Sequence, residues 1–400
     1  TQIPNIEGRR YPSELSGPRY PRGIPIHSEK NLSSLIESEK IDQVFFSYSD
    51  ISYEHMMQKA SVVLAAGADF SLLSPPHTQL KSSKPVIAVC AVRTGCGKSQ
   101  TARKIVEILK KKGRRVVAVR HPMPYGDLTL QIAQRFASYE DLDTHKCTVE
   151  EREEYEPYID NGLVVFAGID YQKILQMAEK EADIIIWDGG NNDLPFFKSN
   201  LHVTVLDPLR AGHERRYYPG EINFIAADIL VINKYEQATK EQIDTLLANI
   251  RECNKSAIVI NGASKITADD PGAVSGKKVL VIEDGPTITH GEMGFGAGTV
   301  AACQFGAKEI IDPRPYAVGS IKKAYANYPH MEKVLPALGY YKDQLRELEE
   351  TIRATPCDLV LIASPIDIRR VIKIDKPSMR VKYHLEELGS PTLGEILKKY

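Results

Sequence analysis

The chain has 400 residues, 42% of them hydrophobic and 26% charged, and 51 Lys and Arg residues nearly balance 52 Asp and Glu residues. A net charge of −1 argues against a general nucleic-acid binder or a polybasic membrane protein, and no apolar run approaches the roughly 20 residues of a membrane helix. The six cysteines are scattered, without metal-ligand spacing. We therefore expect a cytoplasmic protein of two or three domains that binds neither nucleic acid nor membrane.

The N-terminal part, residues 1–78, predicts a small α/β domain. It opens on a polar, proline-rich stretch. Residues 42–50 are then typical of a strand, residues 52–68 of a helix and residues 69–75 of a second strand. We expect these elements to form a Rossmann-like domain that lacks its usual first strand.

The central part, residues 84–285, alternates short apolar runs with helical patterns. KPVIAVCAV at 84–92 is typical of a buried strand, and the amphipathic pattern SQTARKIVEILKKKG follows at 99–113. This alternation predicts a largely parallel sheet with helices on both faces, a three-layer α/β sandwich. Residues 286–400 predict a C-terminal α/β region that completes a substrate site. Further strands are expected within 114–122, 182–190, 201–209, 227–235, 256–264 and 277–285.

Residues 92–99, VRTGCGKS, end as a phosphate-binding loop does. They lie between the buried strand and the helix, where backbone N–H groups and a helix N-terminus make an anion site. Lys98 is placed to reach the β- and γ-phosphates of ATP, and Ser99 to hold Mg²⁺. Asp188 ends the run IIIWD, as a magnesium-holding acid does in P-loop NTPases. The sequence predicts a P-loop NTPase whose nucleotide is contacted by Gly95, Cys96, Gly97, Lys98, Ser99 and Gln100.

Val92 stands where the P-loop pattern has its first glycine, and Arg93 follows it. Some P-loop proteins carry a signature lysine at this second position, and the loop resembles that dimer-forming branch. There the extra cation neutralises phosphate charge, in many cases across a subunit interface, and an arginine can do so with a bidentate fork. We therefore expect a catalytic Arg93 and a homodimer, with a plain surface arginine as the alternative.

Asn233, Lys234 and Glu236 in VINKYEQ resemble the N-K-x-D motif with which GTPases recognise guanine. Glutamate stands where that motif has aspartate, and its extra methylene displaces the carboxylate that would pair with guanine. We therefore expect Asn233 and Lys234 at the nucleotide, with ATP favoured and GTP as the alternative.

Polar and cationic residues recur where the expected strands end. Because the carboxyl ends of parallel strands meet at one edge of a sheet, we expect these residues to gather beside the nucleotide. Concentrated cations at that edge predict a small, multiply anionic, phosphorylated substrate. In this prediction Arg120 and His121 are catalytic. The substrate contacts are Arg120, Tyr125, Arg210, His213, Glu283, Thr287 and Arg314.

A resemblance to a known family covers nearly the whole chain. The cyclic 2,3-diphosphoglycerate synthetases of archaea and their bacterial relatives carry segments similar to AVRTGCGKSQT, VRHPMPYGDL, EEREEYEPYI, WDGGNND, DPLRAGHE, EDGPTITHGEMGFGAG and DPRPYAVGS. The resemblance implies an ATP-dependent ligase that closes 2,3-diphosphoglycerate into a cyclic intramolecular phosphoanhydride and releases ADP and phosphate. Positioning and charge neutralisation dominate such phosphoryl chemistry.

Two other functions stay open at this point. A regulatory or metallochaperone-type GTPase switch fits the signature-type loop and the NKYE segment, although no His- or Cys-rich tract for metal delivery accompanies them. A non-catalytic binding module is disfavoured because scaffolding does not require Lys98, Ser99 and Asp188 together. Substrate-stimulated ATP turnover would favour the synthetase, whereas slow GTP turnover without a partner would favour the switch.

Overall fold

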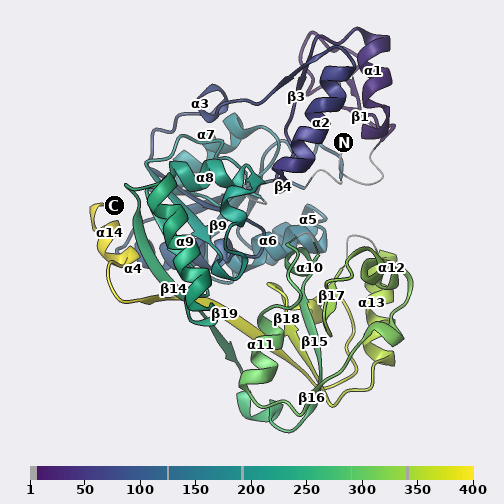
Figure 1. Cartoon of the computed structure of the whole chain (residues 1–400), viewed down its shortest axis with the longest axis vertical. Coiled ribbons are helices and arrows are strands. Elements are labelled where there is room, and N and C mark those ends of the chain that lie inside the picture. The colour runs from purple at the N-terminus through teal and green to yellow at the C-terminus, as the bar shows by residue number, and fades with distance from the viewer. Residues whose placement is uncertain (1–6, 124–125, 191–192, 290, 339–341) are drawn as a thin grey trace.

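The computed structural model describes residues 7–123, 126–190, 193–289, 291–338 and 342–400. In these residues 13 strands form one sheet, in the order β16-β15-β18-β19-β14-β13-β11-β6-β10-β7-β9-β8, with β17 paired to β15 (Figure 1). The sheet has two halves, which are joined where the long strands β14 and β19 pair antiparallel. This largely parallel sheet with helices packed on it confirms the predicted α/β fold class.

The first half is built around β6, whose six residues are all buried. Ile87 and Val89 point into the core on the α4 side, whereas Val86 and Ala88 point into the core on the α7 side. Helices therefore cover both faces, as a near-continuous apolar strand requires. The strands run parallel except β8, which is antiparallel to β9. They are β14 (Ile258–Ala268), β13 (Ile229–Ile232), β11 (Leu201–Leu206), β6 (Val86–Ala91), β10 (Ile184–Trp187), β7 (Val116–Arg120), β9 (Val164–Ala167) and β8 (Gln134–Phe136).

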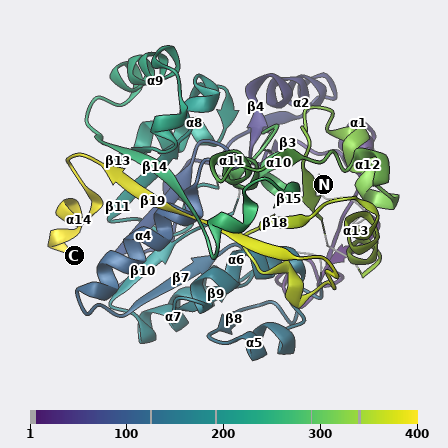
Figure 2. The ribbon, with the colours of Figure 1, turned by 90° about the horizontal axis from the view of Figure 1, so that it is seen from below.

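Helices surround this half of the sheet, and Figure 2 shows α4 alongside β10, β7 and β9 below the level of α8 and α9. The amphipathic α4 packs on β6, β7 and β11. Its N-terminus lies near the end of β6, because only the short turn of residues 92–97 separates the two elements. The helices of this half are α4 (Lys98–Lys111), α5 (Tyr139–Thr144), α6 (Val149–Ile159), α7 (Tyr171–Glu181), α8 (Gly220–Ala226), α9 (Lys240–Cys253) and α14 (Leu393–Ile396).

The second half of the sheet has its own hydrophobic cores. The last strand, β19, then returns to the first half, where Leu393 and Leu397 of the C-terminal tail join the core around α4. The strands of the second half are β16 (Glu309–Ile310), β15 (Lys278–Asp284), β17 (Leu335–Ala337), β18 (Leu359–Ala363) and β19 (Ser378–Leu388). Its helices are α10 (Gly285–Ile288), α11 (Ala297–Gln304), α12 (Gly319–Asn327) and α13 (Lys342–Ala354).

In the N-terminal part, the parallel pair β3 and β5 shares a small hydrophobic core with α1 and α2. The strand predicted over 42–50 ends at Phe45, and the one predicted over 69–75 ends at Ser71, because the chain after each leaves the sheet as a loop. In the described part of the chain no helix combines the length and apolar character needed to cross a membrane. The elements are β1 (Arg10–Tyr11), β2 (Ile24–Pro25), α1 (Leu32–Glu39), β3 (Gln43–Phe45), β4 (Ile51–Ser52), α2 (Tyr53–Ala65), β5 (Asp69–Ser71) and α3 (Pro75–Thr78).

Candidate active site

The turn between β6 and α4 has the backbone of a phosphate-binding loop. Gly95 and Gly97 adopt left-handed conformations, with φ angles of 80° and 103°, that residues with a Cβ atom rarely adopt. A Cβ atom on Gly97 would also come within 2.1 Å of Asn233 Nδ2. Lys98 and Ser99 begin α4, whose first N–H groups have no partner inside the helix and are free to bind an anion. The loop therefore has the arrangement that its motif predicts.

Three side chains that follow β11 and β13 donate hydrogen bonds to consecutive carbonyl oxygens of this loop. The pairs, each 2.8 Å apart, are Arg210 with Thr94, Lys234 with Gly95, and Asn233 with Cys96. Asp207 accepts from Arg210 Nη2 and from Lys234 Nζ, again at 2.8 Å. Burial would raise the pKa of Asp207, but Lys234 and Arg210 outweigh it and lower the pKa to about 2. The sequence predicts Arg210 at the substrate, and Asn233 and Lys234 at the nucleotide. In the structure all three side chains hold the phosphate loop itself.

Asp188 ends β10 among groups that keep it ionised. Its carboxylate forms ion pairs with Lys98 and with Arg120, and it accepts a hydrogen bond from Tyr158 Oη at 2.5 Å. Burial would raise the pKa of Asp188, yet Arg120 and Lys98 lower it to about 2. Arg120 also pairs with Glu154, so the guanidinium expected on substrate phosphate is compensated within the protein.

Arg93 is 1% exposed and is therefore no surface residue. Its guanidinium contacts groups from three parts of the chain: Asp50, His213, Tyr217 and Glu292. The signature-type position is thus engaged within one chain in this structure. The homodimer expected from it stays a prediction.

A cavity of about 170 Å³ opens beside the phosphate loop, between the two halves of the sheet. Glu283 at the end of β15 lines it and accepts backbone N–H bonds of 2.8–3.1 Å from the start of α11, at Gly296, Gly298 and Thr299. Burial raises the pKa of Glu283 to about 7 in spite of these bonds. Five carboxyl side chains line the cavity: Glu150, Glu153, Glu154, Glu283 and Asp284.

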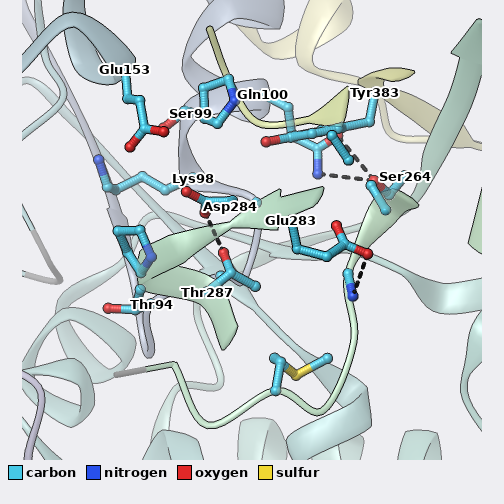
Figure 3. Close-up of a pocket in the computed structure, with 18 of the residues that line it drawn as sticks. Thr94, Lys98, Ser99, Gln100, Glu153, Ser264, Glu283, Asp284, Thr287 and Tyr383 are labelled. Atoms are coloured by element: carbon cyan, nitrogen blue, oxygen red, sulfur yellow. Dashed lines mark hydrogen bonds between the residues drawn. The ribbon is translucent and has the colours of Figure 1, made fainter. Parts of the chain in front are cut away.

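Glu153 of α6 and Asp284 of β15 approach the cavity from different halves of the sheet, on either side of Lys98 and the loop (Figure 3). Glu153 accepts from Ser364 Oγ at 2.9 Å, and Asp284 accepts from Thr287 Oγ1. Burial raises the pKa of both carboxyls, and Asp284 raises that of Glu153 further. Because two carboxylates here repel each other, a cation placed between them would be stabilised.

The remaining predicted residues are spread over several places. Gln100 lines the cavity and donates to Ser264 at 3.2 Å. His121 contacts Tyr171 Oη at 2.8 Å and does not line the cavity. Arg314 pairs with Asp312 on an exposed turn and also lies outside the cavity lining. Tyr125 lies outside the described residues.

The sequence prediction includes Glu283 and Asp188 but not the other acidic residues of this site. Glu153 lies in the glutamate-rich segment 148–159, and that acidic run was the signal that could have found it. Asp284 directly precedes the glycine of the EDG segment, at the end of a strand. Asp50 lies in none of the quoted motifs, and Asp207 opens the segment DPLRAGHE; the partners of both are fixed only by the tertiary structure.

The loop, the helix that follows it and Asp188 at the end of a neighbouring parallel strand define a P-loop NTPase. LpxK from Aquifex aeolicus, solved in complex with ATP, shares the fold: its TM-score is 0.51 at 13% identity, over 92% of this chain and 99% of that one. The chain matches no protein-family model.

The chain belongs to the family of arginine synthetase ArcE from Thermococcus kodakarensis, to which it is 58% identical over 400 residues, all of this chain and 89% of that protein. Cyclic 2,3-diphosphoglycerate synthetase from Thermococcus sibiricus is 24% identical over 289 residues, 64% of either chain. Both relatives are synthetases, which supports an ATP-binding enzyme of the ligase type. The cyclic 2,3-diphosphoglycerate synthetase that the sequence segments resemble is thus a distant relative of this chain. Arginine synthetase ArcE is much more similar to it.

Proposed function

We propose that the protein is an ATP-dependent synthetase whose product is arginine. The observation that carries the proposal is the carboxyl-lined cavity beside the phosphate loop, which suits a cationic guanidinium group. The name of the relative at 58% identity points to the same product. ATP would transfer its γ-phosphoryl group to the ureido oxygen of a precursor and leave as ADP, and ammonia would then displace phosphate from that carbon to form the guanidinium group.

The nucleotide end of the site is supplied by the first half of the sheet. Lys98 now pairs with Asp188 and donates to Gly189 O at 2.7 Å. With a nucleotide bound, Lys98 would turn toward the phosphates, since they offer it more negative charge. Ser99 and the ionised Asp188 fit a magnesium ion, which when bound would neutralise charge on the β- and γ-phosphates.

The substrate end is supplied by both halves of the sheet. A guanidinium group is planar and offers five N–H donors, which suits two carboxylates on different sides. Glu153 and Asp284 provide such a pair next to Lys98. Thr287, the partner of Asp284, packs on the loop, since a Cβ atom on Gly95 would lie 3.0 Å from its Cγ2. A cation held there would lie close to the phosphoryl group being transferred.

The second candidate is the cyclisation of 2,3-diphosphoglycerate, which the relative at 24% identity favours. A substrate with two phosphates and a carboxylate requires cations that are not already compensated. Arg120 and Arg210, expected to serve it, are instead paired with Asp188 and Asp207. Four cationic side chains line the cavity together with the five carboxyl side chains: Arg93, Lys98, Arg103 and Lys234. Arg93, Lys98 and Lys234 are already paired with carboxylates that do not line it. The charge balance of the cavity therefore favours the cationic product.

The test runs the reaction from the product side, because an enzyme catalyses both directions. Protein is incubated with Mg·ADP, phosphate and arginine, and ATP is detected with luciferase. Appearance of ATP that needs arginine, and that is lost in Lys98→Ala, supports the proposal. A parallel phosphorus-NMR time course contains Mg·ATP and 2,3-diphosphoglycerate, with GTP as a second nucleotide. A cyclic product there, without arginine-dependent ATP, would establish the second candidate, and slow GTP hydrolysis alone would indicate a switch.

A further inference from the structure

The segment between β3 and β4 brings the N-terminal domain against the phosphate loop. β4 pairs antiparallel with β12 (Tyr217–Tyr218), and Tyr53 N–H donates to Arg216 O at 3.0 Å. Asp50 directly precedes β4 and has a φ angle of 57°, a left-handed conformation that aspartate tolerates better than most residues. Its side chain is 7% exposed. One domain therefore presents a buried carboxylate to the loop of another.

Both carboxylate oxygens of Asp50 are bound by the first half of the loop. Oδ1 accepts from Arg93 Nε at 2.7 Å. Oδ2 accepts from Thr94 Oγ1 at 2.7 Å and from Thr94 N–H at 3.3 Å. Charge-assisted hydrogen bonds of this kind are strong, and the buried partners have no water to replace them. The N–H group of Thr94 is thus bound by a group outside the P-loop domain.

Arg93 has further contacts, and among the described ones Asp50 is the buried carboxylate. The pKa of His213 is lowered to about 4 by burial and by Arg93 and Arg210, so the ring is neutral at pH 7. Its Nδ1 then accepts from Arg93 Nη1 at 2.7 Å. The Tyr217 ring lies 3.5 Å from the guanidinium carbon, and Glu292, 3.2 Å from Nη2, is 53% exposed. Of the two carboxylates described as paired with Arg93, Asp50 is the one shielded from solvent.

The first half of the loop differs from the usual pattern, which has a glycine at its first position. Val92 occupies that position and is buried, and a Cβ atom on Gly220 would come within 2.3 Å of Val92 O. The carbonyl oxygens of Thr94, Gly95 and Cys96 are held by side chains of the P-loop domain. In the first half, Asp50 binds the N–H group and the hydroxyl of Thr94.

We propose that Asp50 is a positioning residue of the nucleotide site, through which the N-terminal domain fixes the phosphate loop in its binding conformation. Backbone N–H groups bind phosphate well only when they are aimed beforehand, because reorganisation on binding reduces affinity. The N-terminal domain is then a working part of nucleotide binding. This inference rests on the phosphate loop alone and is independent of the substrate under "Proposed function".

The experiment compares the wild type with Asp50→Asn, which keeps the shape of the side chain and removes its charge. Asp69→Asn is the matched control, since Asp69 is exposed on β5 of the same domain. Isothermal titration with Mg·ATP and with AMP is done well below the unfolding temperature of each variant. We expect Asp50→Asn to weaken Mg·ATP binding by about tenfold or more, the effect of losing a charged hydrogen-bond partner. AMP, which lacks the phosphates the loop binds, should lose much less.

A purely structural role for Asp50 would lower the unfolding temperature and leave the Mg·ATP affinity of the folded protein within twofold of wild type. That result would overturn the proposal, as would an equal loss for Mg·ATP and AMP. If Asp50→Asn does not fold, Thr94→Val removes the hydroxyl bond alone and should weaken Mg·ATP binding by a few-fold. An unchanged affinity in folded Thr94→Val would then overturn it. These outcomes are read from nucleotide affinity alone, so they do not depend on whether the protein forms ATP from arginine.

Discussion

Replacing Asp207 by asparagine tests whether the buried charges really hold the phosphate loop. Asp207 is 2% exposed and neutralises both Arg210 and Lys234. Its pKa, lowered from 3.8 to about 2, corresponds to roughly 2 kcal/mol of folding free energy. Breaking one partner of a buried ion pair costs ~3–5 kcal/mol. We therefore expect Asp207→Asn to lower the free energy of unfolding by about 3 kcal/mol and to weaken Mg·ADP binding as the loop loosens.

Urea unfolding followed by circular dichroism gives the free energy, and titration calorimetry gives the Mg·ADP affinity. The matched control is Asp183→Asn, because Asp183 also has a pKa lowered to about 2, by Arg115, but lies on the surface. Solvent screens the ion pair of Asp183 with Arg115, so its loss should lower the free energy of unfolding far less than the loss of the Asp207 pairs. The pKa of Asp207 is lower in the folded protein than in the unfolded chain. Its contribution to the free energy of unfolding is therefore present above about pH 4 and fades as the pH falls toward 2. Equal losses in the two variants, or a loss below ~1 kcal/mol for Asp207→Asn, would refute the reasoning.

Further predictions concern the loop and the cavity. Lys98→Ala and Asp188→Ala should each abolish nucleotide turnover while the fold persists, and a wild-type rate in both would contradict the assignment. Gly97→Ala should remove Mg·ADP binding in calorimetry, because its Cβ atom would meet Asn233 and its φ angle is 103°. Arginine affinity should rise about tenfold between about pH 6 and about pH 8, since the Glu283 carboxyl, with a pKa of about 7, ionises in that range and attracts the cation. The same titration of Glu283→Gln should show a flatter profile; an identical one would exclude Glu283 as the titrating group.

The local parts of the site follow from the sequence. A buried strand, a turn with Gly95 and Gly97 and an amphipathic helix are neighbours in the chain, so their chemistry and geometry are fixed within about 30 residues. Asp188 is farther away, yet its place at the end of a parallel strand brings it to the same edge. These are the cases in which periodicity and strand direction decide the position of a side chain.

The partners of the cations do not follow from the sequence. Arg210 looked like a substrate contact because it follows a strand end, which is where it lies. Its charge is taken up by Asp207, three residues earlier, and its remaining donors reach Thr94 O and Gly291 O. Spacing places a side chain at an edge, but it does not say whether the side chain faces a ligand or the protein. That choice is made by tertiary contacts.

Whether a charged side chain faces a ligand or another protein group also determines the charge of the proposed substrate pocket. Strand-end cations counted alone predict an anionic substrate, whereas in the structure Arg120 and Arg210 are paired with carboxylates and further carboxyl side chains line the cavity. Glu153 and Asp284 come from different halves of the molecule, so neither half alone would make the proposed cation site. A guanidinium group bound between them would draw the halves together over the phosphate loop. Because closing an active site excludes water from a transferring phosphoryl group, we expect the cationic ligand itself to complete the site in which its chemistry takes place.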